Sequence, residues 1–139
     1  HIGSTALETI WAKPIVDILL EIPQSISMEN VKDDLVCNGY LCMCEEENRK
    51  DFNKGYTQEG FADKVFHLHL RYLGDNDELY FRDYLNEYPE TAKEYEKLKL
   101  SLWKPFEHNR DAYTNAKGDF IERQTQSAKW IYRKRYSRL

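Results

Sequence analysis

The spacing of hydrophobic residues along the chain changes near Gly74. Before that glycine, apolar residues come in short runs that are typical of strands. The run Pro14–Ile22 is almost continuously apolar, which predicts a central strand covered on both faces. After Gly74 the apolar positions recur at helical intervals. The sequence therefore predicts a mixed α/β half followed by an all-helical half.

The α/β half contains further predicted elements. A short helix is expected from Ser4 to the residues before Pro14, and a second from Ser27 to about Asn38, with Gly39 at its C′ position. Three strands should follow, at Tyr40–Glu46, Asp51–Tyr56 and Lys64–Tyr72. The links between these strands read as a hairpin turn at Asn48–Lys50 and a longer connection at Gln58–Asp63.

The helical half should hold four helical segments. They are expected at Asn76–Tyr88, from Pro89 onward, as a short turn at Asp111–Tyr113, and at Lys117–Arg135. At 139 residues the chain has the length of one domain. We therefore expect residues 1–139 to form a single domain, with an α/β core at 1–74 and a helical part at 75–139.

Charge narrows the range of partners. A net charge of −4 argues against a general nucleic-acid-coating protein. The stretch Lys129–Arg138 nevertheless holds five basic residues and no acidic one. It could contact nucleic acid or an acidic partner, or it could be a solvated helix end whose cations complement the helix dipole. No apolar run approaches the ~18 residues of a membrane span, so no membrane association is expected.

The three cysteines do not form a disulfide framework. Cys42 and Cys44 lie two residues apart on a predicted strand and should share a face. They could contribute to a metal site, but no second pair follows, so buried free thiols are expected, together with Cys37. Free thiols suggest a reducing compartment, the cytoplasm.

Two features of the first strand region indicate chemistry. A Gly3-Ser4 step at a helix start lets the backbone approach phosphate oxygens and offers a hydroxyl, although it is also an ordinary N-cap. Asp17 interrupts an apolar strand, where an unpaired carboxylate is costly. Asp17 is therefore expected to be paired or to hold the metal that accompanies a nucleotide phosphate.

His67 and His69 form a second candidate constellation. Residues i and i+2 of a strand point the same way, about 6.5–7 Å apart, so Leu68 and Leu70 should face the core. Two such histidines could clasp a metal or a phosphate group, with Asp17 as the third ligand, or could be hydrogen-bonded on a half-exposed face. We expect Asp17, His67 and His69 to face one cleft together with Ser4.

Several collinear motifs resemble the GrpB-like family. His1–Leu19 resembles its "HIGST…AKPI(I/V)DIL" signature, Phe66–Leu70 its "HLH" strand, and Phe81–Leu85 its "FRDYL" helix start. Leu98-Lys99 and Tyr113–Ile121 resemble its C-terminal helical motifs. The chain differs at Leu7-Glu8-Thr9, where the family often has Val-Pro-Gly. It also begins at the family's "HIGS", so an upstream helix and most of a strand are expected to be missing.

The resemblance implies a nucleotidyltransferase-like fold, a mixed sheet with flanking helices. It implies a bound nucleotide or phosphorylated small molecule, with Mg²⁺ or Mn²⁺ and Asp17 as the catalytic carboxylate. An anion pocket would use Gly3, Ser4 and Thr5 together with basic side chains, namely Lys13, Arg71, Arg82 and Lys117. Arg71 extends the face of both histidines by its spacing, whereas Arg82 and Lys117 enter through the motifs alone.

One carboxylate of a standard transfer site is missing. Nucleotidyltransferases carry two aspartates in alternation on this strand, and Ile15 takes the first place here. The site could work with one metal, receive a carboxylate from another strand, or bind nucleotide without transferring it. Glu45, Glu46 and Glu47 are candidates, although a solvated hairpin end is the favoured interpretation of these three residues. Three functions stay open: nucleotidyl transfer, nucleotide or phosphate sensing, and protein interaction through the charged helices.

Overall fold

The computed structural model describes residues 1–10 and 14–137. These residues form two compact units, each with its own core. The α/β unit contains His1–Ala6 and extends to Asn76, and the helical unit combines a segment from Leu7 with Asp77–Arg135. The mixed α/β class is as predicted. None of the helices in the described ranges is long and apolar enough to cross a membrane.

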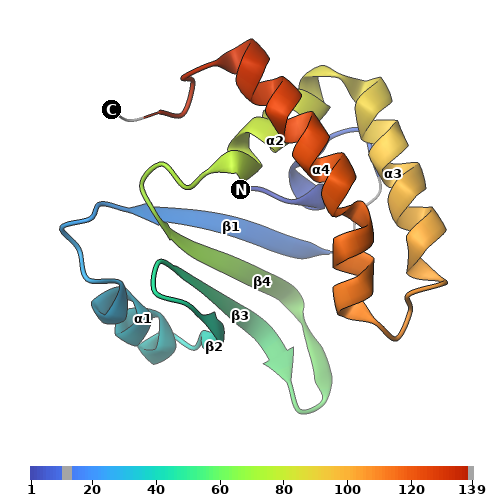
Figure 1. The fold of residues 1–139 in the computed structure, drawn as a ribbon. Coiled ribbons are helices and arrows are strands. Elements are labelled where there is room, and N and C mark those ends of the chain that lie inside the picture. Colours follow the sequence, from blue (N-terminus) through green and yellow to red (C-terminus); the bar gives the residue numbers. More distant parts are fainter. Residues whose placement is uncertain (11–13, 138–139) are drawn as a thin grey trace. The chain divides into compact units, whose positions relative to one another are not determined.

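A four-stranded mixed sheet forms the α/β unit (Figure 1). Its strands are β1 (Ile15–Ile22), β2 (Leu41–Glu45), β3 (Arg49–Thr57) and β4 (Gly60–Tyr72), in the order β1-β4-β3-β2. β1 runs parallel to β4, and the other pairs are antiparallel. The prediction of a central β1 was wrong for the described sheet, where β1 is an edge strand. On the free side of β1, the described residues add an isolated bridge between Ile2 and Asp17.

Helix α1 (Met28–Cys37) covers one face of this sheet. Ser27 caps it as predicted, because its hydroxyl accepts a hydrogen bond from the Asn30 amide at 3.4 Å. Gly39 follows with φ +88°, a conformation that glycine adopts without strain. The core beneath α1 consists of buried side chains from four elements: Ile22, Met28, Phe52, Leu68 and Leu70.

Strand alternation sorts the remaining side chains of β1 and β4 onto the opposite face. Leu68 and Leu70 are buried under α1, as predicted. His67 and His69 therefore project from the other side of β4. Asp17 stands opposite His67 in the parallel register and shares that side. We call it the polar face of the sheet.

A buried lysine fixes α1 to the sheet. Lys50 is only 3% exposed, and its ammonium lies 2.8 Å from Glu29 on α1 and 3.2 Å from Glu45 on β2. The hydrogen bond with Glu29 raises the pKa of Lys50 against the opposing effect of burial. Lys50 pairs with Leu70 in the β3–β4 register, so this ion-pair cluster lies on the α1 face.

The long connection expected at Gln58–Asp63 is instead a tight hairpin. β3 and β4 pair as far as Thr57 and Gly60, where the Thr57 hydroxyl donates to the Gly60 carbonyl at 2.8 Å. The register shifts at Gly55, whose φ of +103° fits a β-bulge. The exposed ends of both strands lack a buried apolar side chain between residues 57 and 64, so the sequence pattern carried no strand signal there.

A register shift also corrects the cysteine prediction. Cys42 stands opposite Phe52 and Cys44 opposite Asp51, two residues on different faces of β3. The two thiols therefore do not share a face, because an irregularity between them breaks the alternation. All three cysteines are free as expected, but they are not buried: Cys37 and Cys44 are exposed and Cys42 is half-buried.

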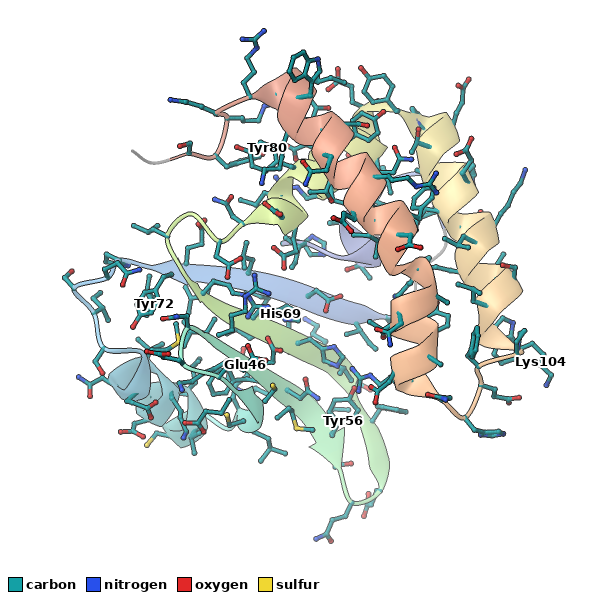
Figure 2. All side chains as sticks on the ribbon, viewed as in Figure 1. Glu46, Tyr56, His69, Tyr72, Tyr80 and Lys104 are labelled. Carbon is teal, nitrogen blue, oxygen red and sulfur yellow. The ribbon has the colours of Figure 1, made fainter. Side chains whose placement is uncertain are left out.

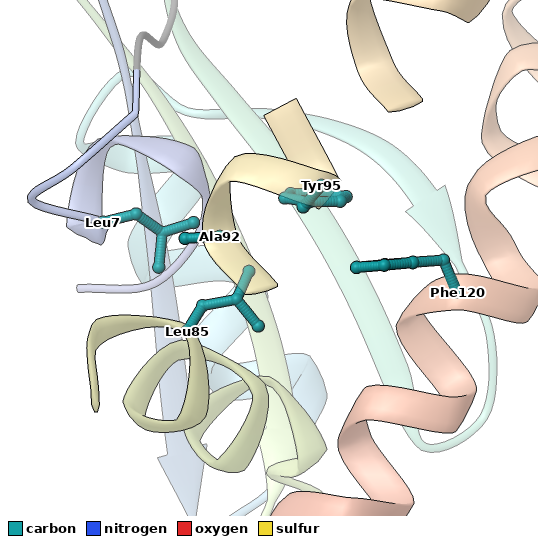
Figure 3. Close-up of a cluster of buried hydrophobic side chains, with 5 residues drawn as sticks. All are labelled: Leu7, Leu85, Ala92, Tyr95 and Phe120. Atoms are coloured by element: carbon teal, nitrogen blue, oxygen red, sulfur yellow. The ribbon is translucent and has the colours of Figure 1, made fainter. Parts of the chain in front are cut away.

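The helical unit consists of α2 (Asp77–Glu87), α3 (Pro89–Trp103) and α4 (Arg110–Tyr132). Its core contains Leu7, Leu85, Ala92, Tyr95 and Phe120 (Figure 3). The two last predicted segments were wrong, because they form one continuous helix. Asn109 caps it by accepting from the Ala112 amide at 3.0 Å. Its turn at residues 114–116 is exposed and holds no large apolar residue, which hid the continuity.

The N-terminal segment also departs from the prediction. Where residues 1–10 were expected to begin a helix, the structure has a single 3-10 turn, η1 (Ser4–Ala6). The last part of that predicted helix, at residues 11–13, lies outside the described residues. Leu7, which is 6% exposed, and Ile10 pack into the core of the helical unit. Tertiary packing of these apolar residues therefore takes the place of the helix that their spacing suggested.

Candidate functional site

Asp17 and two histidines meet on the polar face. The Asp17 Oδ1 atom lies 3.6 Å from His67 Nδ1 and 3.5 Å from His69 Nε2. The cause is local: Asp17 on β1 stands opposite His67 on β4, and His69 lies two residues further along β4 on the same face. All three side chains are about three-quarters buried. The expected juxtaposition of Asp17, His67 and His69 is thus present in the structure.

Each histidine is also held at its second ring nitrogen. His69 Nδ1 is 2.9 Å from Asp51 Oδ1 on β3, and His67 Nε2 is 2.9 Å from the Tyr56 hydroxyl, also on β3. Figure 2 shows His69 on β4 and Tyr56 on β3 near the hairpin. Both rings are therefore oriented by partners on β3 and direct their other nitrogen at Asp17.

The two carboxylates beside His69 change its protonation. Burial opposes the charged ring, but hydrogen bonds to Asp17 and Asp51 outweigh it and raise the pKa of His69 to about 9. The hydrogen bond with His69, aided by Arg71 and opposed by burial, lowers the pKa of Asp51 to about 2. At neutral pH the centre of the face is therefore a carboxylate–imidazolium–carboxylate series.

Further charged side chains extend the row formed by Asp17, His69 and Asp51. Arg71 Nη1 donates to Asp51 at 3.1 Å, and its Nε lies 3.8 Å from Asp75 without a hydrogen bond. Arg49 in turn binds Asp75 through two nitrogens, at 2.6 and 2.7 Å. Arg71 is 6% exposed. Arg71 thus extends the face of both histidines, as its spacing indicated, and brings a buried cation next to Asp51.

Gly3 stands directly against Asp17. A Cβ built at Gly3 would lie 2.3 Å from Asp17 Oδ2, and the residue has φ +73°. The adjoining Ile2 amide donates to the Asp17 carbonyl at 2.9 Å. Ser4 opens η1 beside this contact, while the Thr5 hydroxyl is engaged with His1 at 2.8 Å and the Ile15 carbonyl at 3.1 Å. Thr5 therefore fastens the segment to β1.

The other predicted site residues are not among the described residues of the polar face. Arg82 and Lys117 belong to the helical unit, where Arg82 binds Asp83 at 2.7 Å and Lys117 lies over the Tyr113 ring at 4.7 Å. Lys13 is outside the described residues. Glu45 joins the Lys50 cluster on the α1 face. Glu46 and Glu47 are exposed at the β2–β3 turn, in agreement with a solvated hairpin end.

Sequence reasoning missed Asp51 and Tyr56. Both lie on β3, and they reach the histidines only through the β3–β4 pairing, in which Asp51 stands opposite His69. Phe52 offered a partial signal, because a buried residue within a strand places its neighbours on the other face. The spacing within one strand could not reveal the register that unites them.

The residue types on this face fit a divalent cation in part. Imidazole suits Zn²⁺ and Mn²⁺, a carboxylate suits Mg²⁺ and Mn²⁺, and metal-binding histidines are commonly held at the second ring nitrogen, as His67 and His69 are. Within residues 1–10 and 14–137, however, no group of three or more His, Cys, Asp or Glu is arranged to hold a metal. The donors are present, but they contact one another.

Known proteins place the chain in a family. The GrpB family model, described as "GrpB protein", matches residues 1–127. The chain is 36% identical to glutamate-rich protein GrpB of Alkalihalophilus pseudofirmus, covering 86% of this chain and 72% of that protein. A crystal structure of conserved protein GrpB from Enterococcus faecalis superposes with a TM-score of 0.76 at 28% identity, covering 95% of this chain and 79% of that one. The chain belongs to the GrpB family.

Other relatives are longer than the matched region. The chain is 31% identical to UPF0157 protein YqkA of Bacillus subtilis, covering 93% of this chain but 38% of that protein. A UPF0157 protein of Pseudomonas aeruginosa is 35% identical, with 88% of this chain and 52% of that protein covered. The chain thus spans 38% to 72% of the length of these three curated relatives.

Proposed function

We propose that the polar face binds a nucleotide or another phosphorylated small molecule together with a divalent cation. The observation that carries this proposal is the position of Asp17, whose carboxylate faces one nitrogen of each of two oriented histidines. A carboxylate and two imidazoles on one face form a set of hard and borderline donors. The buried Arg71 guanidinium adds positive charge to the same face.

Asp17, His67 and His69 are the residues that would hold the cation, and His69 would release its proton on binding, because only a neutral imidazole coordinates a metal. When bound, such a cation neutralises phosphate oxygens and polarises them. Mn²⁺ matches the mixed set better than Mg²⁺, which prefers oxygen ligands. Tyr56 and Asp51 would keep the two rings in position through their existing hydrogen bonds. Because Gly3 has no side chain, it leaves space for the Asp17 carboxylate; a Cβ at this position would occupy that space.

Binding without transfer is the second candidate function, and one observation favours it. The carboxylate that β3 supplies, Asp51, is separated from Asp17 by the His69 ring, which contacts both. Two-metal transfer needs carboxylates that share ions. On this face each carboxylate instead faces a different nitrogen of one imidazole, an arrangement suited to a sensing module.

Thermal unfolding with Mn²⁺ and ATP tests the proposal. A ligand at one hundred times its Kd stabilises the folded protein by about 2.7 kcal/mol, which is readily measured. We expect stabilisation of the wild type and at least a tenfold weaker affinity for Asp17→Asn, which keeps the shape but removes the charge. Release of pyrophosphate would identify transfer, and binding without release would identify sensing.

The matched control is Asp33→Asn. Asp33 is an exposed carboxylate on α1, on the side away from the polar face, so this variant should bind as the wild type does. A wild type that is stabilised by neither Mn²⁺ nor Mn²⁺ with ATP contradicts the proposal. Equal loss of binding in both variants contradicts the assignment to Asp17.

A further inference from the structure

Three aromatic rings form a continuous series toward the candidate site. Phe61 on β4 contacts Tyr56 on β3 edge-to-face, with ring centroids 5.2 Å apart. Tyr56 in turn stacks with His67 at 6.1 Å and an interplanar angle of 19°. His67 then faces Asp17. The series therefore leads from the hairpin to the charged centre without a gap.

The outer members of this series are exposed. Phe61 is 73% exposed and Tyr56 is 41% exposed. A cross-strand aromatic pair stabilises a hairpin, and this accounts for the contact between the two rings. It does not account for leaving a phenylalanine so open to water, where its apolar area contributes little to folding. Exposed rings beside a polar cluster are available to a ligand.

We propose that Tyr56 and Phe61 form a stacking subsite for the planar base of a nucleotide whose phosphates lie at Asp17, His67 and His69. The inference rests on the proposed function and narrows its ligand from phosphate compounds in general to those that carry an aromatic ring. Aromatic side chains bind every base, since each base has a π-face. The subsite therefore predicts affinity for nucleotides with little discrimination among bases.

The contribution of base stacking to binding can be separated from that of the phosphates by comparing ATP with inorganic tripolyphosphate. Both carry a triphosphate chain, but only ATP offers a base. Stacking on one aromatic side chain contributes about 1–3 kcal/mol, or about 5- to 150-fold in affinity. We expect the wild type with Mn²⁺ to bind ATP at least about tenfold more tightly than tripolyphosphate. ATP, GTP and CTP should bind within a few-fold of one another.

Variants assign the difference to the two rings. Phe61→Ala should weaken ATP binding about tenfold and leave tripolyphosphate binding unchanged. Tyr56→Leu removes both the ring and the hydrogen bond to His67, so its ATP affinity is compared with that of Tyr56→Phe and should be about tenfold weaker. Tyr56→Phe keeps the ring but loses the hydrogen bond to His67, so it should retain the preference for ATP. Trp103→Ala removes an aromatic residue that is 51% exposed on α3 and should change neither affinity. Far-ultraviolet circular dichroism verifies that each variant is folded.

The outcomes separate the two proposals. If ATP and tripolyphosphate bind equally and the ring variants have no effect, the stacking subsite is overturned while the proposed function stands. If neither compound binds, both are overturned. If Tyr56→Leu weakens both ligands alike and Phe61→Ala weakens neither, Tyr56 acts only through His67, and the stacking subsite is again overturned.

Discussion

His69 is predicted to make the stability of the protein depend on pH in a defined window. We expect the wild type to lose stability at alkaline pH, and we expect His69→Gln to destabilise the protein at pH 6 and to abolish that loss. The physical reason is the imidazolium held between Asp17 and Asp51. Glutamine retains hydrogen-bonding capacity, but it brings no charge to the two carboxylates.

The direction follows from the raised pKa of His69. Its ordinary value of 6.5 rises to about 9 in the folded protein. The stabilising contribution is therefore complete below pH 6.5 and is lost as the pH rises through about 9. Asp51 acts at the other end: its pKa falls from 3.8 to about 2, so its contribution is complete above about pH 4 and is lost toward pH 2.

The His69–Asp51 contact contributes to both pKa shifts, beside Asp17 in one case and Arg71 in the other, so the two contributions are not added. The change at His69 corresponds to about 3 kcal/mol at 1.36 kcal/mol per pKa unit. Asp51 is 38% exposed, and solvent screening reduces the contribution of such a pair. We therefore expect about 1–2 kcal/mol at pH 6 for the loss in His69→Gln.

Urea denaturation of the wild type, His69→Gln, Asp51→Asn and the double variant measures this contribution. The coupling energy of the resulting cycle should be about 1–2 kcal/mol at pH 6 and close to zero at pH 10. The remaining titrating groups are common to all four proteins and cancel. If wild type and His69→Gln lose stability in parallel between pH 6.5 and 9, the charged state assigned to His69 is refuted.

Two further predictions concern Gly3 and Glu45. Gly3→Ala should lower the free energy of unfolding by at least about 1–2 kcal/mol because of the positive φ at this position, and should weaken Mn²⁺ binding because the added Cβ displaces the Asp17 carboxylate. The control Gly118→Ala, in the open interior of α4, should instead raise the free energy of unfolding by about 0.5–1 kcal/mol. Urea denaturation and Mn²⁺ titration measure these effects, and the reverse order of the two variants would contradict the prediction. Glu45→Gln should leave Mn²⁺ and ATP affinities unchanged, because Glu45 pairs with Lys50 on the α1 face; a tenfold loss in calorimetry would show that Glu45 belongs to the site after all.

Local patterns predicted the parts of the fold that depend on neighbouring residues. The alternation of Leu68 and Leu70 with His67 and His69 correctly assigned the two faces of β4. Ser27 and Gly39 correctly marked the ends of α1. These predictions succeed because the period of a strand and the capping of a helix are encoded within a few residues.

Features that depend on distant contacts could not be read in the same way. Leu7 and Ile10 have helical spacing, yet they are drawn into a core formed by residues about 80 to 110 positions later. The edge position of β1 and the opposite faces of Cys42 and Cys44 depend on strand order and on an irregularity in pairing. Neither property is visible in the hydrophobicity of one strand.

The same limit explains why the sequence suggested a site with one carboxylate while the structure contains a second one nearby. Asp51 reaches the polar face through the β3–β4 register, but the His69 ring occupies the space between it and Asp17. Bringing both carboxylates to one ion would require that ring to leave, and would separate Asp51 from His69 while Arg71 still held it. That rearrangement sacrifices two charge-assisted contacts before any ion is bound. The arrangement therefore favours ligand binding centred on Asp17 over a transfer reaction that needs both carboxylates.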